Sequence, residues 1–79
     1  MSTALTFRYD RAGDILYIDT CRPYQGQDSE EVGDGVVARI NPTTGAIENL
    51  ELLFFLARLS QEGEFRVPVA GELRLTPKT

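Results

Sequence analysis

Apolar residues recur at strand spacing in short runs before residue 52 and at helix spacing from there onward. In the segment 6–10, Phe7 and Tyr9 alternate with polar residues, which is the pattern of a strand with one buried face. The later stripe has the i, i+3, i+4, i+7 spacing of an amphipathic helix and consists of Leu52, Phe55, Leu56 and Leu59. A run of strands followed by a helix indicates an α+β fold with an antiparallel sheet.

Turn residues mark a first β-hairpin. The strand 6–10 is followed by the loop Arg11–Gly13, in which Gly13 is suited to a left-handed backbone conformation. A second strand, 15–20, comes next. Its residues 15–18 are apolar on both faces, which is typical of a central strand or of one that is covered on its second side.

A second hairpin follows a polar stretch. Residues 21–33 contain few apolar side chains and are predicted to form a loop. The strands 35–40 and 46–51 then enclose the segment 41–45, where a proline early and a glycine at the end indicate a tight turn. After the helix, residues 65–75 alternate only briefly and indicate an extended segment.

These elements predict a four-stranded antiparallel meander sheet, made of two β-hairpins, with one helix on a face of the sheet. The helix is expected to begin near Leu52 or Leu53, and a short extended C-terminal tail follows it. The chain of 79 residues and 8.8 kDa allows a single domain, residues 1–79. In so short a chain the gain from apolar burial barely matches the entropy of ordering, so pairing with another chain is a common route to stability.

Charge and cysteine usage exclude several classes of partner. The formal net charge is −4 and the eight Lys and Arg residues are scattered, whereas binding a phosphate backbone requires clustered positive charge. Cys21 is the only cysteine, which fits a reducing cytoplasm. The N-terminal residues do not resemble a signal peptide, and the longest apolar run, 52–57, is too short for a bilayer. We therefore expect a small acidic cytoplasmic protein with no nucleic-acid or membrane partner.

The residue types needed for most catalytic sites are missing. The chain has no histidine, which excludes the common nucleophile–base systems and the commonest zinc ligand sets. Cys21 is interpreted as a small residue at a strand end, because its sequence neighbours do not favour a thiolate. Glu48 and Glu51 are three positions apart on one strand, so alternation predicts that they lie on opposite faces. We therefore expect no enzyme activity, no cofactor and no metal.

Carboxylates around the first hairpin have two interpretations. Asp10 and Asp14 flank the loop, and Asp19 lies further along the second strand. Together they could hold a hard cation, although their spacing is not that of an EF-hand. Asp10 could instead accept backbone hydrogen bonds within the turn. Glu51 is a further candidate, and a glutamate on this strand could pair with Arg39 on the neighbouring strand.

The segment 9–18, Tyr-Asp-Arg-Ala-Gly-Asp-Ile-Leu-Tyr-Ile, resembles the opening signature of a family of short prokaryotic proteins, domain of unknown function 2283. Looser matches are 33–37, Gly45 and 49–53, with Asn49 in place of the usual glycine. The resemblance implies a fold but no mechanism, because the family has no assigned activity. The polar positions that match the family's pattern are Asp10, Asp14 and Glu51.

Three functions are compatible with the sequence. The first is a non-enzymatic interaction module that associates with itself, or alternatively with a second protein. The second is an antitoxin-like inhibitor of a small basic toxin, a role suggested by the acidity and by genes that neighbour some members of the family that the chain resembles. The third is a cation- or ligand-binding protein that uses the carboxylates.

The expected self-association is a homodimer with the helix at or near its interface. One helix on one sheet needs a single apolar stripe, so apolar residues outside that stripe are left without a partner. The interface residues predicted on this ground are Leu53, Phe54 and Ala57.

Overall fold

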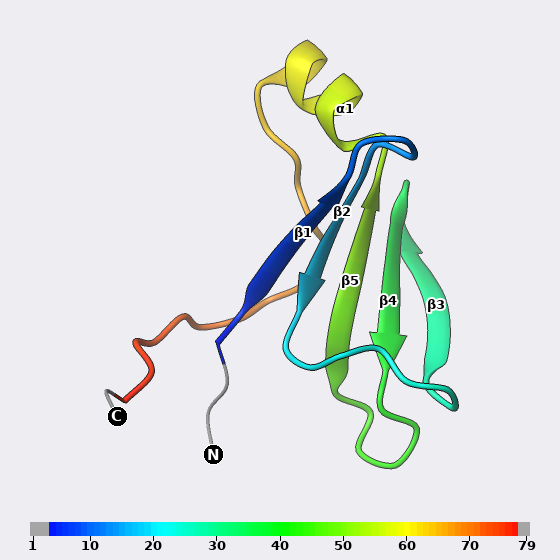
Figure 1. Ribbon diagram of the computed structural model, residues 1–79, viewed down its shortest axis with the longest axis vertical. Coiled ribbons are helices and arrows are strands. Elements are labelled where there is room, and N and C mark those ends of the chain that lie inside the picture. Colours follow the sequence, from blue (N-terminus) through cyan, green and yellow to red (C-terminus); the bar gives the residue numbers. More distant parts are fainter. Residues whose placement is uncertain (1–3, 78–79) are drawn as a thin grey trace.

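Five antiparallel strands and one short helix form the computed structural model, which describes residues 4–77 (Figure 1). The elements are β1 (Thr6–Asp10), β2 (Ile15–Asp19), β3 (Asp28–Gly33), β4 (Val36–Ile40), β5 (Ile47–Leu53) and α1 (Phe55–Glu62). The strands lie in the order β1-β2-β5-β4-β3. The predicted α+β class, with an antiparallel sheet and one helix, is therefore confirmed, whereas the predicted number of four strands is wrong.

The additional strand, β3, lies in the stretch predicted to be a loop. Asp28, Glu30 and Glu31 are all exposed, so no apolar alternation marks it as a strand. It pairs with β4 through a tight turn that contains Asp34 and Gly35, and Gly35 has a φ of 70°. An Asp-Gly pair is a strong hairpin signal, and charged side chains are common on edge strands because they discourage pairing with other chains.

The predicted meander is also wrong, because β2 pairs with β5 and not with the strand that follows it. The chain leaves β2 in the middle of the sheet and must reach the far edge before β3 can begin. Residues 20–27 therefore cross one face of the sheet, in front of β5 and β4 in Figure 1.

The two faces of the sheet have different compositions. One face is apolar, and the register across the strands aligns on it Phe7, Tyr9, Leu16, Ile18, Val36, Ala38, Leu50 and Leu52. The other face is mostly polar, and the same register aligns on it Arg8, Tyr17, Asp19, Arg39, Asn49 and Glu51. Among the described residues, the fully buried apolar core is small and consists of Val36, Ala38 and Leu52.

The helix α1 lies beyond one end of the sheet and not on its face, contrary to the prediction (Figure 1). It begins at Phe55 because Leu52 and Leu53 pair with β2 and continue β5. Leu52 is buried in the sheet, whereas Leu56, predicted to lie in the buried stripe, is 47% exposed. The apolar face is therefore left to the C-terminal segment, which passes behind the strands in Figure 1. A Cβ added to Gly33 would lie 3.0 Å from Pro68 of this segment.

Two glycines test the turn between β4 and β5. A Cβ added to Gly45 or to Gly71 would meet no atom within 4 Å, but only Gly45 has a left-handed φ, of 78°. We expect Gly45→Ala to lower the free energy of unfolding by about 1 kcal/mol, because an L-residue is strained there. The measurement is urea denaturation. Gly71→Ala is the matched control and should leave the midpoint nearly unchanged; equal midpoints for both variants would contradict this account.

Candidate functional site

Asp14 holds the beginning of helix α1 from outside the helix. Its carboxylate accepts hydrogen bonds from the backbone N–H groups of Leu56 (2.9 Å) and Ala57 (3.2 Å) and from the Tyr9 hydroxyl (2.7 Å). Phe54, at the N-cap position, provides no side-chain cap. The hydrogen bond from Tyr9, followed by those from the two backbone groups, lowers the pKa of Asp14 below its usual range. Asp14 therefore connects the first hairpin to the helix.

Asp10 and Asp14 have separate partners and do not converge. Asp10 accepts a hydrogen bond from the backbone N–H of Ala12 (3.0 Å), as expected for an aspartate in a turn. The left-handed residue of this loop is Asp14, with a φ of 54°, and not Gly13 as predicted. That conformation brings the carbonyl of Asp14 within 3.0 Å of the Phe55 N–H, and aspartate tolerates it better than most residues do.

Asp19 lies on the polar face, where its partner is Arg8. Across residues 4–77, no group of three or more aspartate, glutamate or cysteine side chains is arranged to hold a metal ion. The three aspartates of the cation hypothesis are thus not brought together.

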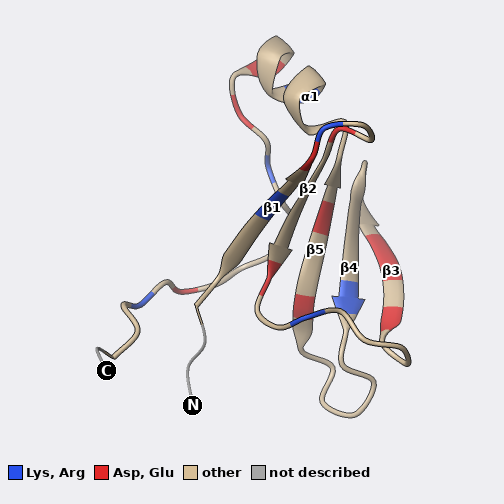
Figure 2. Cartoon of the chain, in the orientation of Figure 1, with Lys and Arg blue, Asp and Glu red and all other residues tan. Residues whose placement is uncertain are grey.

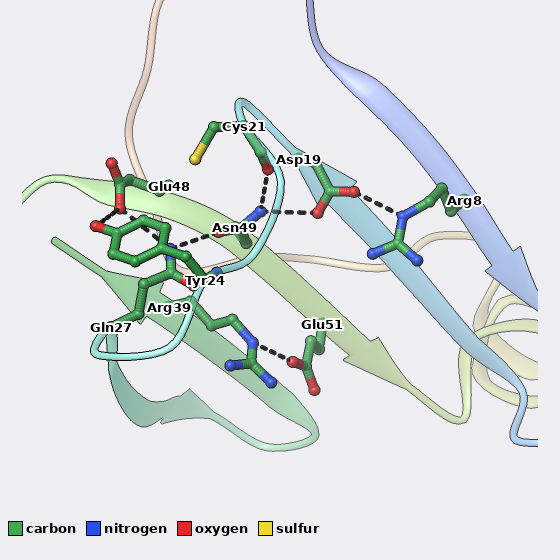
Figure 3. A network of polar contacts seen from close by, with 9 residues as sticks. All are labelled: Arg8, Asp19, Cys21, Tyr24, Gln27, Arg39, Glu48, Asn49 and Glu51. Atoms are coloured by element: carbon green, nitrogen blue, oxygen red, sulfur yellow. Dashed lines mark hydrogen bonds and ion pairs between the residues drawn. The ribbon is translucent and has the colours of Figure 1, made fainter.

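A β-bulge places two consecutive polar residues of β5 on the polar face. The register with β4 shifts by one residue, so that Glu48 is extra in β5. The Gln27 amide nitrogen donates hydrogen bonds to both Glu48 (3.1 Å) and Asn49 (2.8 Å), which shows that the two side chains share a face (Figure 3). Strand alternation had predicted opposite faces for Glu48 and Glu51, and the bulge makes that prediction wrong.

Asn49 is the buried centre of this face. It is 2% exposed, and its amide nitrogen donates to the Asp19 carboxylate (2.9 Å) and to the Cys21 carbonyl (2.7 Å). Its amide oxygen accepts from Gln27. Buried polar groups are stable only when they are hydrogen-bonded, and this amide satisfies several at once. It binds the crossing segment 20–27 to the sheet at both ends.

Arg8 is held on the polar face by two neighbours. Its Nε donates to the Asp19 carboxylate at 2.7 Å (Figure 3). Its guanidinium also lies 4.5 Å from the centre of the Tyr17 ring. Burial tends to raise the pKa of Asp19, but the hydrogen bonds from Arg8 and Asn49 outweigh it and lower the pKa below its usual range. Asp19 is therefore an anion that completes an ion pair on the sheet.

Glu51, the third candidate shared with the family's pattern, forms the other ion pair of this face. The Nε of Arg39 donates to its carboxylate at 2.8 Å, which is the cross-strand pairing considered for a glutamate of this strand. Tyr24, on the crossing segment, donates its hydroxyl to Glu48 at 2.7 Å. That hydrogen bond raises the pKa of Tyr24 to about 12 and lowers the pKa of Glu48.

An open hollow lies beside this network. It is lined by Thr6, Arg8, Asp19, Cys21, Arg22 and Pro23, with a volume of about 720 Å³. Arg22 belongs to the crossing segment 20–27, which carries a blue, basic stretch in Figure 2. Cys21 is a free and exposed thiol. Sequence reasoning did not find this hollow, because it forms only when the crossing segment lies against the edge strand and its neighbour.

The three predicted interface residues are spread around the junction of β5 and α1. Leu53 is half-buried at the end of β5, Ala57 is exposed on the helix, and Phe54 is 62% exposed. Phe54 also has a left-handed φ of 55°, which is uncommon for a bulky residue. Below this junction, the apolar face has a second exposed area that includes Leu5 and Phe7.

The fold and its polar face define a small α+β protein in which a long connection crosses an antiparallel sheet. By comparison with known sequences, the chain belongs to the family described as "Protein of unknown function (DUF2283)", whose family model matches residues 6–55. That match covers all five strands and ends where the helix begins. No curated protein and no solved structure matches the chain. Within residues 4–77, none of the helices has the length and hydropathy needed to cross a bilayer.

Asn49→Ala tests the buried amide. We expect the free energy of unfolding to fall by about 1–3 kcal/mol, because the Asp19 carboxylate loses a buried hydrogen bond and the Cys21 carbonyl loses a partly buried one. Chemical denaturation measures the loss. Gln25→Ala, at an exposed position of the same crossing segment, should change the midpoint little. A loss no greater than that of the control would show that Asn49 does not hold the segment.

Asp14→Asn tests the helix cap through its pH dependence. The pKa of Asp14 is lower in the folded state than in the unfolded state, so its stabilisation is present above pH 4 and is lost as the pH falls through the folded value. The variant should therefore be less stable than wild type at pH 7, and the difference should shrink toward pH 3. Denaturation midpoints at both values measure this. Asp28→Asn is the matched control, and a gap that does not depend on pH would contradict the assignment.

Proposed function

We propose that the chain is a non-enzymatic interaction module whose partner is a second copy of itself. The observation that carries this proposal is the uncovered part of the apolar face. The helix α1 stands at the end of the sheet, where the Phe55 ring lies 6.3 Å from the Tyr9 ring, and the C-terminal segment passes over the same face (Figure 1). On the β1 side, Phe7 is 60% exposed and Leu5 is 43% exposed.

The C-terminal segment itself adds apolar surface. Val69, which borders a shallow apolar depression with Leu5, Ile18 and Leu50, is 40% exposed. Further along, Leu73 is 86% exposed. A tail that completed the core of its own chain would hide such side chains. Exposed apolar side chains gathered around one depression are typical of association sites.

The total exposed area supports a second copy as the partner. The chain exposes 6199 Å², whereas a monomeric protein of this mass is expected to expose about 4,800 Å². The excess is therefore about 1,400 Å², and a stable interface of standard size buries about 800 Å² on each partner. One self-complementary interface accounts for most of it, and a two-fold pair is the commonest closed arrangement.

The helix junction is the second candidate for the same interface. The exposed ring of Phe54 is held by a strained backbone, and such strain persists where the surrounding structure or a function requires it. The two areas lie on β1 and at the end of β5, so single substitutions separate them. The sheet face is preferred because it offers more apolar side chains.

Light scattering at micromolar concentration tests the proposal. We expect a mass of twice 8.8 kDa for wild type and a mass near that of one chain for Phe7→Glu, because a buried carboxylate without a partner opposes association. Thr43→Glu, in the turn between β4 and β5, is the control and should remain dimeric. Phe54→Glu tests the helix junction separately.

Each result of these measurements leads to a different conclusion. A wild-type mass near 8.8 kDa would refute self-association. A dimer that survives Phe7→Glu but dissociates with Phe54→Glu would move the interface to the helix junction. A circular dichroism spectrum equal to that of wild type is required of each variant, so that dissociation is not confused with unfolding.

A further inference from the structure

The guanidinium of Arg8 is fixed in place but only partly used. It is anchored through Nε to Asp19 and packs over Tyr17, and within residues 4–77 its two terminal nitrogens form no hydrogen bond. The Arg8 side chain remains 49% exposed. A planar guanidinium held in this way presents a rigid pair of donors, which is the geometry that matches a carboxylate or phosphate group.

Asp19, which holds Arg8 in place, is itself held by a hydrogen bond. Asp19 receives a hydrogen bond from Asn49, and Asn49 receives one from Gln27. This series of hydrogen bonds leads from the hollow to the buried part of the polar face. Arg8 is therefore already oriented in the absence of a ligand. A binding site needs such support, because a side chain that must be ordered on binding weakens the complex.

Positive charge predominates in the hollow, although the chain as a whole is acidic. Its charged lining consists of the Arg8 and Arg22 guanidiniums and one carboxylate, that of Asp19, whereas the net charge of the chain is −4. Of these, Arg22 forms no ion pair with any residue in 4–77. Thr6 adds a hydroxyl to the same lining.

We propose that this hollow binds a small molecule through its oxyanion group, a carboxylate or a phosphate, with Arg8 as the oriented donor and Arg22 as the second cation. The site lies on the polar face and is independent of the apolar face that is proposed to pair with a second copy. Asp19 would serve as a positioning residue for Arg8. A planar carboxylate and a tetrahedral phosphate share the donors they need, so the experiment includes both.

Nuclear magnetic resonance titration with succinate and with inorganic phosphate, each against sodium chloride at equal ionic strength, tests the proposal. We expect the side-chain Nε–H signals of Arg8 and Arg22 to shift saturably. A response to one probe alone identifies the group that is preferred. Arg74, which forms an exposed ion pair with Glu72 on the tail, provides an internal reference. If the shifts at Arg74 equal those at Arg8, or if neither probe exceeds chloride, the proposal is overturned.

Two variants test the roles. Arg8→Lys keeps the charge but removes the planar fork, and we expect binding to weaken about tenfold. Arg22→Gln removes a charge without touching the buried network, so it remains informative if Arg8→Lys fails to fold. Arg74→Gln is the matched control and should bind as wild type does. Undiminished affinity in both Arg8→Lys and Arg22→Gln would overturn the assignment.

The single cysteine offers an independent readout. Cys21 lines the hollow and is exposed, so alkylation by neutral iodoacetamide reports on this position alone. The probe that shifts the arginine signals should slow alkylation several-fold in wild type relative to chloride. The same comparison in Arg22→Gln should show less protection. Equal protection in the variant and in wild type would contradict a role for Arg22.

Discussion

The pairing of β2 with β5 determines most of what is distinctive in this structure. It joins the first hairpin to the strands that follow and leaves β3 at the far edge. Because β2 is already paired on both sides, the chain has to cross a face of the sheet to reach that edge. The crossing segment carries polar side chains and needs polar partners beneath it. The amide of Asn49 and the carboxylate of Glu48 supply them, and the β-bulge allows both to point the same way.

The first hairpin has a second structural role through Asp14. Tyr9 and Asp14 belong to the segment that resembles the family signature, and here they hold the first turn of α1. The family model ends at residue 55, where that turn starts. The hydrogen bonds of a turn and of a helix cap are thus concentrated in a few residues of β1 and its loop. This gives a physical reason for a tyrosine and two aspartates at these positions that requires no ligand.

The sequence was informative where an apolar pattern or a clear turn marked an element. Alternation of apolar and polar residues located β1, and turn residues located the hairpin of β4 and β5. The change from strand spacing to helix spacing of the apolar residues predicted the helix. It failed at β3, because an acidic edge strand has no buried face to mark it. It also failed at Leu52 and Leu53, whose spacing fits a helix but whose partners lie in β2. The polar face could not be predicted, because one bulge reverses the alternation and only tertiary structure brings residues 20–27 to Asn49.

The acidic edge strand also limits how copies of this protein can assemble. An open sheet has two edges, and a chain that joins edge to edge can add copies without end and form a filament. One of the two edges here is β3, the strand farthest from β1, with Asp28, Glu30 and Glu31 exposed along it. A neighbour joined there in antiparallel fashion would set these carboxylates against its own, and like charges on paired strands repel. Growth is therefore blocked on one side of the sheet, which favours closed, finite assemblies over polymers.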